Sequence, residues 1–212
     1  MKKKYRRGLT LIELLVVVAI IAILAAILLP YVMNRTEDSR ISRMEEEIQS
    51  IRSAVTMFFN DNSTLPSIWN NFVVNTGFPN WRGPYIQKAP NTATATWNQA
   101  SPWKTNYVIR TQTGGTNYRF ASSTNLYPFG NGFAIEIANP MVGTSPTIPL
   151  TSLAKIDTDL DDGNAGTGFI VEANGGTTPL INPSTTTQMA GLSTGGAYQG
   201  GGKSMYVLIF TY

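Results

Sequence analysis

The sequence predicts an α+β fold in which one long N-terminal helix packs on an antiparallel β-sheet. Residues 9–60 combine an apolar run with an amphipathic stretch and contain no glycine, which is typical of a helix. Five later segments are short and rich in β-branched and aromatic residues, and loops rich in Gly, Thr and Asn separate them, as expected for strands. A chain of 212 residues is long enough for one such domain with appendages.

The basic residues of the chain are concentrated at its N-terminus. Five of the sixteen Lys and Arg residues lie within the first seven positions, and the rest of the chain carries eleven basic against thirteen acidic residues. Beyond the leader, residues 1–8, the chain therefore lacks a basic surface for nucleic acid, which we do not expect as a partner. By the positive-inside rule, the basic cluster keeps the N-terminus cytoplasmic and directs the following residues across the membrane.

Residues 9–30 are predicted to form a membrane-spanning half of the helix. From Leu9 to Leu29 only Thr10 and Glu13 are polar, and about 20 apolar residues cross a hydrocarbon core as a helix. An acidic side chain at the bilayer centre costs roughly 2.5 to 3.5 kcal/mol, so Glu13 predicts a functional partner. A cleaved secretory signal is the alternative, but the residues after the apolar run offer no small-residue cleavage site.

Residues 31–62 are predicted to continue the helix as an amphipathic half. Pro30 removes one helix hydrogen bond and either kinks the helix or marks its end at the membrane surface. The helical pattern resumes soon after it, which favours a kinked continuous helix. Apolar residues recur at steps of three and four and form one stripe: Ile41, Met44, Ile48, Ile51, Val55 and Phe58. We expect this stripe to pack on the sheet, with a coiled coil as the alternative.

The N-terminal residues resemble a known processing signal. Gly8 ends the basic leader, and Leu9, Thr10 and Glu13 open an alanine-rich apolar run that ends at Pro30. This arrangement resembles the class III signal of type IV pilins and type II secretion pseudopilins. The resemblance implies the pilin fold, cleavage of the Gly8–Leu9 bond by prepilin peptidase, and N-methylation of the new Leu9 amine.

Cleavage would provide a partner for Glu13. The new amine lies four residues before Glu13, and in a filament the amine of one subunit meets the carboxylate of its neighbour. Breaking such a buried pair costs roughly 3 to 5 kcal/mol, so the pair would fix the register of assembly. Alternatively, Glu13 lies near the helix start and reaches the lipid headgroups. In assembled pili of the resembling family the segment before the proline unwinds, which here corresponds to Ala22–Pro30.

Residues 63–212 are expected to form a globular antiparallel β domain with long Gly- and Thr-rich loops. Its strand signals are Asn106–Arg110, Tyr118–Ala121, Phe133–Ile137, Gly168–Val171 and Met205–Tyr212. The residues that resemble packing and turn residues of major pseudopilins are Trp81, Gly83, Pro84, Tyr85, Pro102 and Trp103. Residues 174–202 are rich in Gly, Thr and Ser and are expected to form a long surface loop or a peripheral meander.

One dense acidic cluster is a candidate calcium site. Its carboxylates are Asp157, Asp159, Asp161 and Asp162. Calcium takes six to eight oxygen ligands, and alternating Asp residues in a glycine-containing loop supply several of them. The spacing differs from that of an EF-hand, and major pseudopilins of the resembling family bind calcium in a C-terminal acidic loop. The alternative is a hydrogen-bonded Asx turn within residues 161–164.

The sequence predicts no catalytic site. The absence of His and Cys removes the commonest general base, thiolate ligands and any disulfide framework. Residues 197–204 match a relaxed phosphate-binding loop and residues 101–104 match Ser-x-x-Lys, but the helix and motifs that accompany these patterns in enzymes are missing. We therefore expect no enzymatic activity and no cofactor besides the candidate calcium ion.

The chain is thus expected to be a structural filament subunit. The resemblance implies a single-pass inner-membrane prepilin with a cytoplasmic N-terminus, held in the lipid bilayer before assembly. Prepilin peptidase, an inner-membrane assembly platform and other pilins would convert it into a helical homo-oligomer. Long polar loops favour a surface type IV pilus subunit, and a periplasmic pseudopilus subunit of type II secretion is the alternative. A further alternative is a membrane-anchored binding module whose first helix is only an anchor.

Overall fold

The computed structural model describes residues 10–125 and 128–212. Contacts divide the chain into the units Met1–Ser39 and Arg40–Tyr212, and helix α1 (Leu11–Asn62) contributes to both. The predicted processing residues Gly8 and Leu9 lie outside the described residues.

In the N-terminal unit the apolar run of α1 is exposed throughout. Every large hydrophobic residue from Leu11 to Met33 is at least 49% exposed. The helix continues through Pro30, as predicted, and the segment Ala22–Pro30 is helical in this isolated chain. Within the described part of the chain, α1 is the one helix that is long and apolar enough to cross a membrane.

In the C-terminal unit one face of α1 is buried, and this confirms the predicted stripe. Its six residues, together with Ala54, are at most 4% exposed. They join a core cluster with alternate residues of the sheet, among them Tyr107, Phe133 and Val207. At the end of α1 the Asn62 side-chain amide donates a hydrogen bond to the carbonyl of Phe58 at 3.0 Å.

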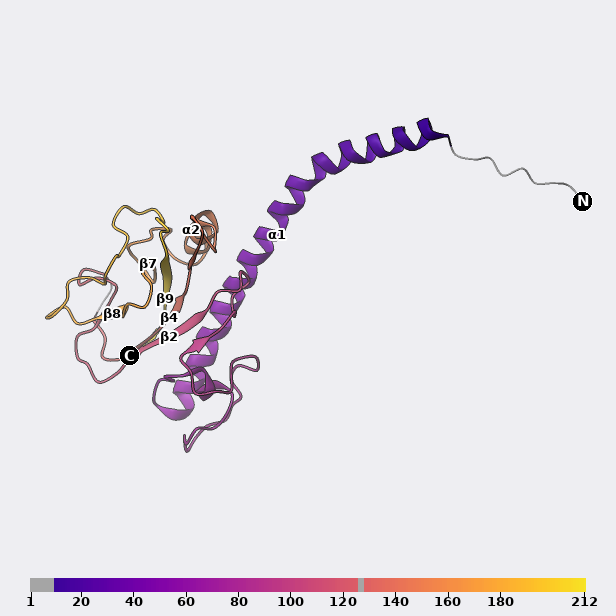
Figure 1. Ribbon diagram of the computed structural model, residues 1–212. Helices are drawn as coiled ribbons and strands as arrows, with labels where there is room; N and C mark the ends of the chain where they lie inside the picture. Colours follow the sequence, from indigo (N-terminus) through magenta and orange to yellow (C-terminus); the bar gives the residue numbers. More distant parts are fainter. Residues whose placement is uncertain (1–9, 126–127) are drawn as a thin grey trace, which may run out of the picture. The chain divides into compact units, whose positions relative to one another are not determined.

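A five-stranded antiparallel sheet forms the centre of the C-terminal unit (Figure 1). In spatial order its strands are β1 (Thr96–Trp97), β2 (Tyr107–Gln112), β4 (Gly132–Ile137), β9 (Lys203–Thr211) and β7 (Ile170–Asn174). Four of the five predicted strand segments lie in this sheet. The fifth, Tyr118–Ala121, contains β3 (Arg119–Phe120), which pairs instead with β8 (Leu180–Ile181) in a separate sheet. A short 3-10 helix η1 (Trp69–Phe72) and the hairpin β5 (Met141–Val142) and β6 (Ser145–Pro146) complete the strands and turns around it.

Both faces of the central sheet are covered, so every residue of β4 is buried. One face packs on α1 and α2 (Leu150–Leu160), while a second cluster on the other face includes residues of β3 and β8. Of the two alternatives for residues 174–202, a surface loop is therefore wrong for part of the segment, which contains the short strand β8. Its buried residues are Leu180, Ile181, Met189, Leu192 and Tyr198.

Helix α2 was not among the predicted elements. It contains Asp157 and Asp159, which were expected in a loop, and its C-cap is Asp161. Leu153, Ile156 and Asp157 are buried, which is the three-and-four spacing of one helix face. The density of Asp residues obscured this pattern, because Asp favours caps and turns over helix interiors.

The aromatic loop that follows α1 acts in packing, as expected. The Tyr85 hydroxyl donates to Asp61 Oδ2 at 2.8 Å, and the Trp81 indole donates to the carbonyl of Asn71 at 2.9 Å. Trp103 is buried in the core. These contacts tie the loop to the end of α1.

Candidate functional site

Glu13 forms a capping box with Thr10 at the start of α1. Both the backbone N–H and the hydroxyl of Thr10 donate to Glu13 Oε2 at 2.8 Å. The Glu13 N–H donates in return to Thr10 Oγ1 at 3.3 Å. In the isolated chain the Glu13 carboxylate is therefore hydrogen-bonded within its own helix turn. Its negative charge also interacts favourably with the positive N-terminal end of the helix dipole.

Tyr31 and Arg35 mark the end of the apolar run after Pro30. The Arg35 Nε and Nη2 atoms donate to the Tyr31 hydroxyl at 3.2 and 3.1 Å, and the guanidinium lies 5.2 Å from the ring centroid. Aromatic and cationic side chains of this kind are enriched where a membrane helix leaves the hydrocarbon core.

The second candidate site is an acidic cluster of three carboxylates, Asp157, Asp161 and Asp162. One carboxylate oxygen from each lies within 4.8 Å of the others. Asp157 is 0% exposed, and its Oδ2 accepts a hydrogen bond from the Tyr198 hydroxyl at 3.0 Å. Its Oδ1 is buried and has no hydrogen-bond partner among the described residues. Leaving a buried polar atom unpaired costs about 1 to 3 kcal/mol, so this oxygen requires an explanation.

Backbone geometry brings Asp161 into the cluster. Its Oδ2 accepts hydrogen bonds from the N–H groups of Phe169 and Ile170, the latter at 2.8 Å. Gly168 makes this approach possible, because a Cβ there would lie 2.1 Å from Asp161 Oδ2 and its φ is +75°. Asp161 lies one helical turn after Asp157, and the chain that returns after α2 fixes the orientation of its carboxylate.

The predicted Asx turn is also present. Asp162 Oδ1 accepts from the Asn164 N–H at 2.8 Å, and Asp162 Oδ2 accepts from the Thr167 hydroxyl at 2.6 Å. The fourth carboxylate, Asp159, lies outside the cluster and pairs with Lys155 at 2.7 Å. The turn and a cation site are compatible, since each carboxylate oxygen has more than one acceptor direction.

The electrostatics of the cluster favour a bound cation. Burial raises the pKa of Asp157 to about 6, and the charges of Asp161 and Asp162 add to this rise, while hydrogen bonding by the Tyr198 hydroxyl and the Gly163 backbone lowers the pKa. Burial also raises the pKa of Asp161, although Arg52 acts in the opposite direction. Two oxygens that share a calcium ion at 2.3 to 2.6 Å lie at most about 5 Å apart, and the cluster meets this limit.

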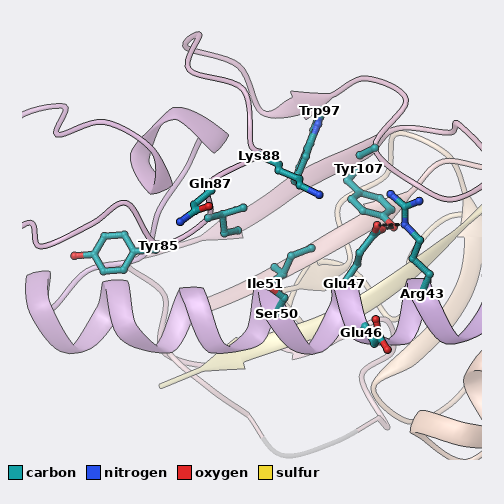
Figure 2. Close-up of a pocket in the computed structure, with 12 residues that line it drawn as sticks. Arg43, Glu46, Glu47, Ser50, Ile51, Tyr85, Gln87, Lys88, Trp97 and Tyr107 are labelled. Carbon is teal, nitrogen blue, oxygen red and sulfur yellow. Dashed lines mark hydrogen bonds and ion pairs between the residues drawn. The ribbon is translucent and has the colours of Figure 1, made fainter.

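A groove of about 680 Å³ runs along the C-terminal half of α1 (Figure 2). At its α1 side, Glu47 accepts from the Tyr107 hydroxyl at 2.7 Å and from Arg43 at 3.0 Å. Among the described residues, none of the buried unpaired polar atoms belongs to its lining. The groove therefore shows no polar atom that a ligand must satisfy.

Two buried carboxylates were not predicted from the sequence. Glu172 is 0% exposed and binds the backbone of residues 199 and 200, while Glu136 pairs with Arg110. Each is a single acid among apolar strand residues, and that interruption was the one available signal. Their partners lie far along the sequence, so only the tertiary structure identifies them.

Comparisons with known proteins place the chain in a family. The model of the prokaryotic N-terminal methylation motif matches residues 3–29. The type II secretion system core protein G of Pseudomonas aeruginosa is 35% identical over 98 residues, which is 42% of this chain and 69% of that protein. The chain belongs to the type IV pilin and type II secretion pseudopilin family. Its members are structural subunits rather than enzymes, and so is this pilin-like chain.

Similarity to fimbrial pilins is higher in identity but shorter. The type IV major fimbrial protein FimA of Dichelobacter nodosus is 47% identical over 53 residues, 25% of this chain and 34% of FimA. A fimbrial protein of Pseudomonas aeruginosa is 43% identical over 51 residues, 24% of this chain and 33% of that protein. The chain thus spans about a third of the length of these fimbrial relatives. No solved structure matches the chain.

Proposed function

We propose that this pilin-family chain is the subunit of a type IV pilus or related filament, made as an inner-membrane prepilin and polymerised through the N-terminal half of α1. The observation that carries the proposal is the exposed apolar run from Leu11 to Met33, interrupted by the single acid Glu13. Such a surface requires a bilayer before assembly and helices of other copies afterwards.

Processing converts the precursor into the assembling form. The methylation motif at residues 3–29 supports cleavage after Gly8 and methylation of the Leu9 amine. That amine is four residues from Glu13, which Thr10 caps in the isolated chain. On assembly, Glu13 exchanges this local cap for the amine of a neighbouring copy, so each subunit fixes the register of the next.

The filament type has two candidates. Exposed polar loop segments in the C-terminal unit, such as residues 184–188, favour a surface pilus, since a pilus presents its globular domains to the surroundings. The longer similarity to core protein G, over 98 residues against 53 for FimA, supports a periplasmic pseudopilus of type II secretion. We place the surface pilus first.

Substitution of Gly8 tests the proposal. In cells with prepilin peptidase, Gly8→Ala is expected to leave the precursor uncleaved at its full mass, because the peptidase no longer recognises its site. Filaments should then be absent. The matched control Lys4→Ala keeps most of the basic leader and should be processed normally. Wild-type fibres are examined by electron microscopy, and mass spectrometry should find N-methyl-Leu9 in them. Long surface fibres identify a pilus, and short periplasmic assemblies identify a pseudopilus.

The opposite result would identify a different class of protein. If Gly8→Ala leaves both the mature mass and the filaments unchanged, the prepilin proposal is wrong. If wild-type protein stays in the membrane without forming any filament, the chain is instead an anchored binding module.

We also propose that Asp157, Asp161 and Asp162 bind a calcium ion that stabilises the C-terminal unit. The unpaired Asp157 Oδ1 and the 4.8 Å grouping support this site. When bound, the ion supplies positive charge that offsets three crowded carboxylates. A ligand that binds only the folded state raises its stability.

Calcium titration with a matched control tests the site. In the full chain in detergent, wild-type protein should bind calcium by calorimetry and gain thermal stability. Asp157→Asn is expected to weaken binding at least about tenfold, because a neutral amide replaces a buried charged ligand. Asp159→Asn, which alters a neighbouring carboxylate outside the cluster, should leave the affinity within about twofold. Equal losses in both variants would show general acidity rather than a site.

A further inference from the structure

A glycine-rich segment, residues 193–203, is anchored on Glu172 of β7. The Ser193 hydroxyl donates to Glu172 Oε2 at 2.6 Å, and the N–H groups of Gln199 and Gly200 donate to the same carboxylate at 2.7 and 2.9 Å. The segment contains five glycines, and glycine loses more conformational freedom on ordering than any other residue. Its order therefore depends on a few specific contacts.

The same segment packs against the turn of the acidic cluster. The Ala165 N–H donates to the carbonyl of Gly196 at 3.1 Å. A Cβ at Gly166 would lie 2.1 Å from the Ser193 carbonyl oxygen, so the two backbones are in close contact there. The glycine-rich segment and the residues after α2 thus form one continuous contact.

Tyr198 supplies the contact between this segment and the acidic cluster itself. Its ring belongs to the main core cluster, and the residue is 8% exposed. Its hydroxyl donates to Asp157 Oδ2 at 3.0 Å, while Asp157 Oδ1 has no hydrogen-bond partner in the part of the chain that the structure describes. The hydroxyl therefore holds the carboxylate in an orientation that leaves one oxygen unused.

We propose that Tyr198 is a positioning residue of the cation site and that calcium bound at the acidic cluster fixes the glycine-rich segment against α2. The inference rests on the calcium site proposed above. Hydrogen-bond partners of metal ligands orient those ligands and change metal affinity by roughly 10- to 100-fold. Because coupling is reciprocal, an ion that holds Asp157 in place also stabilises the Tyr198 contact and the segment that carries it.

The test compares two tyrosines whose hydroxyls both donate hydrogen bonds within the protein. Tyr206 is buried, and its hydroxyl donates to the carbonyl of Asn174 at 2.8 Å, outside the cluster. The full chain in detergent is titrated with calcium chloride, and hydrogen exchange is followed on peptides that cover residues 193–203. Tyr198→Phe should weaken calcium binding about tenfold and remove most of the calcium-dependent protection. Tyr206→Phe should change neither by more than about twofold.

The outcomes separate the inference from the proposals on which it rests. Wild-type protein that binds no calcium would overturn both the cation site and this inference, while the filament function would be unaffected. Calcium binding with equal affinity and equal segment protection in Tyr198→Phe would overturn the inference alone.

If Tyr198→Phe fails to fold, hydrogen exchange of the wild-type protein with and without calcium tests the inference instead. Calcium should then slow exchange chiefly at residues 193–203 and at the residues that follow α2. Protection spread evenly over the C-terminal unit would contradict a specific link, and so would protection that persists in Asp157→Asn.

Discussion

The two halves of α1 have opposite relations to the rest of the chain. From Arg40 onward the helix buries a stripe of apolar residues against its own sheet. From Leu11 to Met33 its apolar residues are exposed on every side. A helix that is apolar all round is normally buried in a core or a membrane, whereas a one-sided stripe is typical of a helix on a globular domain.

This difference shows that one half completes a fold and the other half requires an external partner. The apolar stripe of the C-terminal half is buried within one chain, so its sequence contributes to the stability of the fold. The apolar residues of the N-terminal half can be buried only by lipid or by other copies, so its sequence serves assembly. Glu13 lies in the second category, since an acid in an apolar helix contributes nothing to hydrophobic burial.

The largest expected effect comes from Glu13→Ala. Filament yield should fall at least about 100-fold, because roughly 3 to 5 kcal/mol is lost when one partner of a buried ion pair is removed. The stability of the C-terminal unit should not change. Sheared filaments are quantified by immunoblot against total membrane subunit, with the exposed Glu46→Ala on the same helix as the control.

A normal yield in Glu13→Ala would contradict assembly through this carboxylate. A parallel fall in Glu46→Ala would show instead that the filament responds to the net charge of α1.

One truncation in each half of α1 tests whether the two halves act separately. Phe58→Ala, at a fully buried position, should destabilise the C-terminal unit by about 3 to 5 kcal/mol through loss of burial and a cavity. Ile23→Ala, at a position 63% exposed, should alter that stability by less than about 0.5 kcal/mol but reduce filament yield. Urea unfolding of the full chain in detergent measures the first quantity. If Ile23→Ala destabilises the unit as Phe58→Ala does, the halves do not act separately.

The fold was predictable where sequence neighbours determine it. The buried stripe from Ile41 to Phe58 follows from helical spacing alone, and β2, β4 and β9 follow from β-branched and aromatic runs. Helix α2 was missed because its Asp residues favour turns, although Leu153 and Ile156 show the helical spacing. The second layer on the sheet was missed because its apolar residues are scattered through Gly- and Thr-rich chain.

The candidate sites divide in the same way. Glu13 was found because an acid in an apolar run is a local signal. The acidic cluster was predicted from the density of Asp residues. The tertiary structure decides which residues belong to it, because it brings Tyr198 to Asp157 and pairs Asp159 with Lys155 outside the cluster. Spacing along the chain does not reveal that the Tyr198 hydroxyl donates a hydrogen bond to Asp157, 41 positions earlier.

Pro30→Ala tests the helix within the exposed half. Proline has no N–H and costs about 3 kcal/mol in a helix interior, yet α1 continues through it. The substitution should restore a hydrogen bond to the carbonyl of Ala26 and slow amide exchange in residues 26–33 at least about tenfold. Exchange by mass spectrometry on detergent-solubilised subunit measures this, with Ile23→Ala as the control. Unchanged exchange would show that the helix is not weakened at the proline.

The smallest expected effect distinguishes two roles of Glu13. Thr10→Ala removes the hydroxyl of the capping box but keeps the backbone N–H bond, so the first turn should lose about 1 kcal/mol. Amide exchange in residues 11–14 should become up to about fivefold faster, while Thr10→Ser should match wild type. Filament yield should stay within about twofold, because the carboxylate remains for a neighbouring amine. If Thr10→Ala lost filaments as completely as Glu13→Ala, Glu13 would act as a cap of its own helix.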